Sequence, residues 1–167
     1  MMDYYLMEPD NNINSPLKFT DYFNFHNKNT DAVIESDITE KTKLIDYARP
    51  IDHNTFYHMF SDKIKDVIGG YDENIIFYGV FVTSYNKKRQ YAYWRIDTLK
   101  LKRVMIENAN EIRKVHEIEF SRNQIENSLI FCIVKSKHDY IAVREDLAES
   151  ILRRCPIGIA LKRLAVL

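Results

Sequence analysis

The chain has 167 residues, which is the usual size of one domain. Its apolar share is 46% and its aromatic share is 13%, with only 4 Gly and 4 Pro, so composition excludes disordered, collagen-like and low-complexity proteins. Basic and acidic residues number 24 each, so net charge provides no general attraction for a polyanion or an acidic membrane.

The sequence predicts a soluble, cytoplasmic protein. Cys132 and Cys155 do not make a disulfide framework in a chain with enough apolar residues to form a core. Residues 1–8 contain acidic side chains and no apolar stretch of signal-peptide length. The longest uncharged apolar run, Ile75 to Val82, is far shorter than the roughly 20 residues that cross a bilayer.

Charge is unevenly distributed along the chain. Residues 1–60 carry ten acids and five bases, whereas residues 61–167 carry fourteen acids and nineteen bases. The two parts should attract one another, and no Pro-, Gly- or Ser-rich linker separates them. We therefore expect a single domain over residues 1–167, with a loop-rich part at 1–60 and the helices and main sheet at 61–167.

The first expected elements are short. Asn and Asp are frequent from Asp10 to Asp31, which indicates loops near strands at Tyr4 to Met7 and Ala32 to Glu35. Ser61 is a good N-cap, and apolar residues at 64, 67 and 68 predict a short amphipathic helix that ends at Gly69 and Gly70.

The following segment predicts several strands. Ile75 to Val82 and Tyr91 to Ile96 form an expected hairpin around an exposed turn at residues 86–89. The further expected strands are Leu99 to Ile106, Ile112 to Phe120, Leu129 to Val134 and Tyr140 to Val143. The third of these is almost wholly apolar, so we expect it to be central in its sheet.

The C-terminal part predicts a helix followed by a strand. From Glu145 to Cys155 the apolar residues recur at spacings of three and four, with Cys155 on the apolar stripe and Pro156 ending the helix. A closing strand is expected at Ile157 to Leu164. Many strands with few helices, and without regular alternation of the two, favour an α+β domain with a mainly antiparallel sheet.

No familiar catalytic motif is present, which favours a protein that is not an enzyme and needs no cofactor or metal. His53 and His58, with Asp52, are five residues apart and have no cysteine partner, so a metal site is not favoured. Cys132 is expected to be a small buried hydrophobic residue. An unrecognised enzyme using His53, His58 or His116 remains an alternative, and acids that could pair for acid–base chemistry are Glu107, Glu111, Glu117 and Glu119.

One stretch has a local basic charge. Residues 85–103 contain seven bases and one acid, interleaved with three tyrosines and Trp94. Basic and aromatic residues on a sheet are used to bind single-stranded nucleic acid, although no RNA-binding fingerprint is present. Tyrosine, tryptophan and arginine also dominate protein interfaces, and this second interpretation is favoured.

The chain also resembles a known family. The segments that carry the likeness are residues 3–10, residues 60–68, Tyr93-Trp94-Arg95-Ile96-Asp97, residues 130–143, the Leu147 to Arg154 helix and Ile157-Gly158-Ile159. In this order they resemble the bacterial immunity-protein domains of polymorphic toxin systems, in the family numbered eleven.

The resemblance implies a cytoplasmic antidote that binds a cognate toxin or effector and blocks it by occlusion, without catalysis. Such a protein needs anchoring aromatic and arginine side chains and complementary charge for fast association. Independently of the family, the hairpin gives the candidate partner-binding residues: Tyr85, Lys88, Arg89, Tyr91, Tyr93 and Arg95. A nucleic-acid-binding module using residues 85–103 is the alternative.

Overall fold

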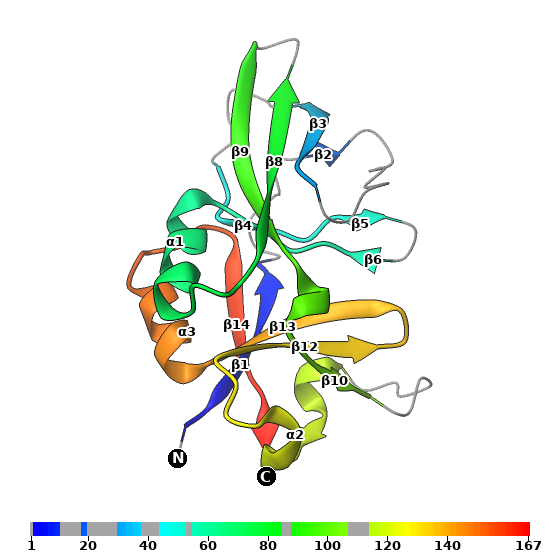
Figure 1. The fold of residues 1–167 in the computed structure, drawn as a ribbon, viewed down its shortest axis with the longest axis vertical. Coiled ribbons are helices and arrows are strands. Elements are labelled where there is room, and N and C mark those ends of the chain that lie inside the picture. Colours follow the sequence, from blue (N-terminus) through cyan, green and yellow to red (C-terminus); the bar gives the residue numbers. More distant parts are fainter. Residues whose placement is uncertain are drawn as a thin grey trace.

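The fold was examined in a computed structural model, which describes residues 2–10, 18–19, 30–37, 44–52, 55–84, 88–106 and 114–167. It is an α+β domain whose strands pair mostly in antiparallel fashion, as the sequence predicts. Two larger sheets lie one above the other in Figure 1, and helices cover one side where they meet.

The five-stranded sheet has the order β10-β12-β13-β1-β14. Its strands are β1 (Tyr4–Pro9), β10 (Lys102–Met105), β12 (Ile130–Lys135), β13 (His138–Arg144) and β14 (Ile159–Arg163). Neighbours are antiparallel except β10 and β12. The apolar strand β12 lies inside this sheet, next to the middle strand β13, because its side chains are buried on both faces.

The six-stranded sheet has the order β2-β3-β8-β9-β7-β4. Its strands are β2 (Lys18–Phe19), β3 (Ala32–Asp37), β4 (Tyr47–Ala48), β7 (Met59–Phe60), β8 (Phe77–Ser84) and β9 (Arg89–Ile96). Only β3 and β8 are parallel among its described pairs. Two minor ladders join β5 (Ile51–Asp52) to β6 (Thr55–Phe56) and β11 (Glu119–Phe120) to β15 (Ala165–Val166).

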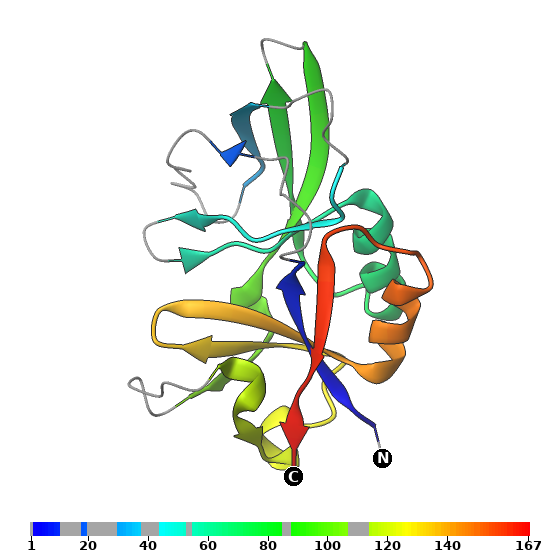
Figure 2. The same cartoon turned by 180° about the vertical axis from the view of Figure 1, so that it is seen from behind.

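Helices α1 (Asp62–Tyr71) and α3 (Glu145–Leu152) pack against each other beside the sheets (Figures 1 and 2). The Tyr71 hydroxyl joins them, because it donates to the Asp146 carbonyl at 3.0 Å and lies 2.6 Å from the Ser150 hydroxyl. A core cluster continues from Phe60 of the six-stranded sheet to Val143 of the five-stranded sheet, so the two sheets share one hydrophobic core.

Three ion pairs connect the acidic N-terminal part to the basic remainder. Their oxygen–nitrogen distances are short: Asp46 to Lys63 at 2.9 Å, Glu8 to Lys162 at 2.5 Å and Asp3 to Arg163 at 2.7 Å. These ion pairs, in which a partly or fully buried acid meets an exposed base, agree with the charge asymmetry of the sequence.

Two of the expected strands are replaced in part by turns. Leu99 lies in the 3-10 turn η1 (Thr98–Lys100), because its N–H donates to the Asp97 carboxylate at 3.1 Å, and the strand begins only at Lys102. The strand expected from Ile112 to Phe120 contains the 3-10 turn η2 (Val115–Glu117) and only the short β11. A short helix that was not predicted, α2 (Arg122–Ile125), follows and begins with a capping box of Ser121 and Gln124.

Both main helices end elsewhere than predicted. Helix α1 continues through Gly69 and Gly70 to Tyr71. Helix α3 ends at Leu152, and the prediction that Cys155 lies on its apolar stripe is wrong, since Cys155 is exposed with a positive φ of 48°. The chain turns before Pro156 because the following residues must return to pair as β14 with β1.

Gly158 has a backbone conformation that favours glycine over any other residue. Its φ is +85°, and an added Cβ would lie 3.0 Å from Ile45 Cβ. We expect Gly158→Ala to lower the free energy of unfolding by about 2 kcal/mol. The control is Gly70→Ala in α1. Its added methyl group meets open space, and the change should raise the free energy of unfolding by about 1 kcal/mol. Denaturant unfolding measures both, and equal effects would contradict the prediction.

Candidate functional site

The predicted hairpin is confirmed and is the most projecting feature of the fold. Strands β8 and β9 pair from Phe77↔Ile96 to Ser84↔Arg89. Figures 1 and 2 show the hairpin extending from the body at the end opposite to both chain termini. Lys88 and Arg89, at the outer end of β9, are exposed there.

Position along β9 separates the candidate residues by exposure, from Arg89 at the exposed end to Arg95 at the buried end. Tyr93 and Arg95 lie on the inner face, where their exposed fractions are 2% and 4%. The Tyr93 hydroxyl donates to the Ile45 carbonyl at 2.9 Å, and burial raises the pKa of that hydroxyl. The Arg95 guanidinium lies over two aromatic rings, 5.6 Å from Tyr57 and 5.1 Å from Tyr78.

This burial corrects the predicted site. Tyr93 belongs to a core cluster of the six-stranded sheet and Arg95 is buried beside it, so these two side chains offer almost no surface to a partner. Tyr85 lies outside the described residues. Three candidates remain accessible: Lys88 and Arg89 are exposed near the turn, and Tyr91 is half-buried. Within the described part of the chain, neither cation forms an ion pair.

A groove of about 450 Å³ follows the edge of β9 and includes Tyr91. We call it the β9 groove. It is lined by Leu44–Asp46, by Ser61–Lys63 and by Gln90–Tyr93. These segments are far apart in the sequence, and sequence reasoning found only the last of them. Leu44 is 46% exposed, so a large apolar side chain faces solvent at the groove.

Asp46 fixes the wall of the β9 groove opposite the strand. Its carboxylate accepts hydrogen bonds from the Ser61 hydroxyl and the Ile157 N–H, each at 2.7 Å, and pairs with Lys63. Three partners hold this buried acid, so the start of α1 and the segment before β4 are fixed relative to each other. The Tyr93 hydroxyl, which donates to the Ile45 carbonyl, ties the same segment to β9. The groove is preformed.

The outer face of β9 is anchored on α1. The Trp94 indole N–H donates to the Asp62 carboxylate, and Lys65 Nζ lies 4.7 Å from the centre of the ring. The indole of Trp94 thus has a hydrogen-bond acceptor in Asp62 and a cation near its ring in Lys65. Trp94 is partly covered by α1 rather than presented as a free stacking platform.

The basic stretch does not form one surface. Lys102 pairs with Glu126 at 2.7 Å, and Arg103 is bound by Asp139, so both lie on the five-stranded sheet away from the hairpin tip. Of the aromatic residues in the stretch, Tyr93 is buried. A continuous track of cations and stacking rings, which single-stranded nucleic acid would need, is not assembled by the described residues.

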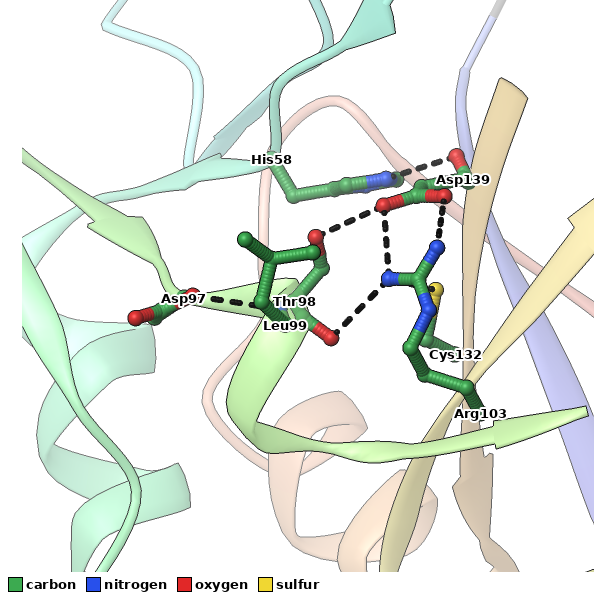
Figure 3. Close-up of polar contacts among 7 residues, drawn as sticks. All are labelled: His58, Asp97, Thr98, Leu99, Arg103, Cys132 and Asp139. Atoms are coloured by element: carbon green, nitrogen blue, oxygen red, sulfur yellow. Dashed lines mark hydrogen bonds and ion pairs between the residues drawn. The ribbon is translucent and has the colours of Figure 1, made fainter. Parts of the chain in front are cut away.

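A buried polar network joins the two sheets (Figure 3). The Asp139 carboxylate accepts two bonds from the Arg103 guanidinium, at 3.0 and 3.2 Å, and one from the Thr98 hydroxyl at 2.7 Å. The Asp139 carbonyl lies 2.9 Å from His58 Nε2. Since a carbonyl can only accept, Nε2 carries the proton, and Nδ1 accepts from the Tyr47 hydroxyl at 2.7 Å.

Two of the side chains that sequence reasoning raised for chemistry, His58 and Cys132, are fully buried. Burial lowers the pKa of His58 to about 4, so the ring is neutral near pH 7. Burial, reinforced by the Asp139 charge, raises the pKa of the Cys132 thiol to about 12, so it is protonated. Glu117 and Glu119 are exposed while Ile118 and Phe120 are buried, which is the pattern of a solvated edge.

Of the remaining candidates, the structure describes His116. His116 lies 3.8 Å from the Glu117 carboxylate, while His53, Glu107 and Glu111 lie outside the described residues. Among the residues whose side chains are described, no group of three His, Cys, Asp or Glu is arranged to hold a metal ion.

Comparison with known proteins adds no assignment. No family model matches the chain, and a search of curated proteins finds no match. The likeness to immunity-protein domains therefore stays a prediction. In the described part of the chain, no helix is long and apolar enough to cross a membrane.

Proposed function

We propose that this protein is a non-catalytic immunity protein that binds a cognate bacterial toxin or effector and neutralises it by occlusion. The observation that carries the proposal is the projecting hairpin, on which Lys88 and Arg89 are exposed beside a preformed groove. Exposed cations accelerate association with an acidic partner, and a preformed groove reduces the entropy lost on binding. The family resemblance supports the same function.

The first experiment is a pulldown of the tagged full chain from its source cells, with and without nuclease, at moderate salt. Recovery of one stoichiometric protein whose toxicity the chain suppresses in co-expression supports the proposal. Recovery of nucleic acid alone, lost after nuclease, would overturn it in favour of the nucleic-acid-binding alternative.

Charge reversal at the hairpin tip tests which face binds. We expect Lys88→Glu with Arg89→Glu to slow association with the captured protein by about tenfold at low salt, because electrostatic attraction sets the encounter rate. The difference should shrink as salt screens the charges. The control is Lys100→Glu with Arg154→Glu, which reverses two exposed charges elsewhere. Stopped-flow association measures both, and equal slowing would place the contact off the hairpin.

A further inference from the structure

Among the described residues, one edge of strand β9 is paired only over part of its length. The Ile96 N–H donates to the His58 carbonyl at 3.1 Å, and Trp94 pairs with Phe60 at the end of β7. Backbone polar groups alternate between the two edges of a strand, so Ala92 and Gln90 direct theirs to the same side as Ile96. Within the described residues, no strand pairs with Ala92 or Gln90 on that side.

The β9 groove lies along this open edge. Gln90 and Ala92 form one wall, and Leu44 contributes exposed apolar surface to the other. A second strand could therefore continue the sheet beyond β7 and place one side chain against Leu44. An open edge beside an apolar recess is the arrangement that binds extended peptides by strand addition.

The charges around the groove indicate the chemistry of the occupant. Asp46 and Lys63 pair with each other, so their charges are compensated. Asp62 accepts a hydrogen bond from the neutral Trp94 indole, so its negative charge remains on the wall near α1. Lys88 and Arg89 lie next to Gln90 at the end nearest the turn, and neither has an ion-pair partner among the described residues. The groove is therefore negative beside Asp62, and only its end nearest the turn, beside Lys88 and Arg89, is positive.

We propose that the β9 groove binds an extended segment of a protein partner by adding it as a strand to the edge of β9. The segment carries an apolar side chain that covers Leu44 and Ala92, and carboxylates that reach Lys88 and Arg89. This inference rests on the proposed function in assuming a protein partner, and it specifies the face and the kind of segment that is bound.

The test is a selection of peptides from a displayed random library against the full chain. We expect the selected peptides to be rich in Asp or Glu around an apolar residue, and to slow hydrogen exchange of the Gln90 and Ala92 amides, measured by NMR. Amide protection at the strand edge is a readout that general surface binding would not produce. An empty selection, or peptides that protect amides elsewhere, would overturn the proposal.

A matched pair of variants tests whether the peptide binds in the β9 groove. Leu44→Asp puts a carboxylate on the apolar wall and should weaken peptide binding by about tenfold or more. Leu152→Asp changes an exposed leucine of similar exposure at the end of α3 and should change binding less than about twofold. Both positions are exposed, so the fold should persist, and far-UV circular dichroism checks this. Equal weakening by the two variants would contradict the groove.

The failure of this inference can be separated from that of the antidote function. If a toxin is captured and neutralised while amide protection falls outside β9, the function stands and the groove does not. If acidic peptides protect Gln90 and Ala92 but no toxin is neutralised, strand addition stands and the antidote function does not. A single-stranded oligonucleotide that alone protects the tip would overturn both.

Discussion

Asp139→Ala is expected to lower the free energy of unfolding by about 3 kcal/mol. Asp139 is 8% exposed, and its carboxylate accepts three hydrogen bonds, two of them from Arg103. Alanine leaves the guanidinium without its counter-charge and the Thr98 hydroxyl without an acceptor. The Arg103 side chain is 30% exposed, so water compensates part of the loss and the expected cost is at the lower end for a buried ion pair.

Two further variants make the measurement specific. Glu149→Ala removes an exposed ion pair with Arg153 and should change stability by less than about 0.5 kcal/mol. Arg103→Met combined with Asp139→Ala should cost less than the sum of the two single changes, because the unpaired charge is gone. Additive losses in urea unfolding would show that Arg103 and Asp139 do not stabilise each other.

The stability of the fold should fall as the pH is lowered from 6.5 towards 4. His58 has a folded pKa of about 4 because burial disfavours its charged form, whereas a free histidine has a pKa of about 6.5. Between these values the unfolded state binds a proton that the folded state does not, so stability rises with pH across this window. The shift corresponds to about 3 kcal/mol.

Unfolding titrations at several pH values, together with the NMR titration of the His58 ring, measure this effect. His58→Gln should have lower stability near pH 7 but a flatter dependence between pH 4 and 6.5. His116→Gln changes a histidine outside the network and should keep the slope of the natural chain. A His58 ring that titrates near 6.5 in the folded protein would contradict the buried, neutral assignment.

Local sequence patterns correctly predicted the helices and strands in which a hydrophobic pattern repeats within the element itself. The apolar spacing of Ile64, Val67 and Ile68 defines α1, and the unbroken apolar run gives β12. The β8–β9 hairpin also follows from local signals, since two strand-like runs flank a polar turn. Errors arose at element ends, where Asp97 binds the Leu99 N–H and where α3 stops at Leu152. Side-chain caps and returning strands decide those ends, and apolar periodicity carries no information on them.

The candidate site was predicted only in part for a related reason. Period-two alternation shows that Tyr91, Tyr93 and Arg95 share one face of β9, but it does not show which face is buried. An aromatic or arginine side chain suits either environment, so composition could not decide. Arg95 is buried because Tyr57 and Tyr78 supply ring faces for its guanidinium, and both lie in other strands or loops.

The sequence by itself determined the α+β class, the main helices, the hairpin and the exposed basic residues at its tip. Tertiary structure alone decided the β9 groove, since its walls come from residues 44–46, 61–63 and 90–93. It also decided the junction in which Asp139 holds Arg103 and His58. Both features depend on long-range packing that brings separate segments to hydrogen-bonding distance, whereas the elements themselves follow from neighbours along the chain.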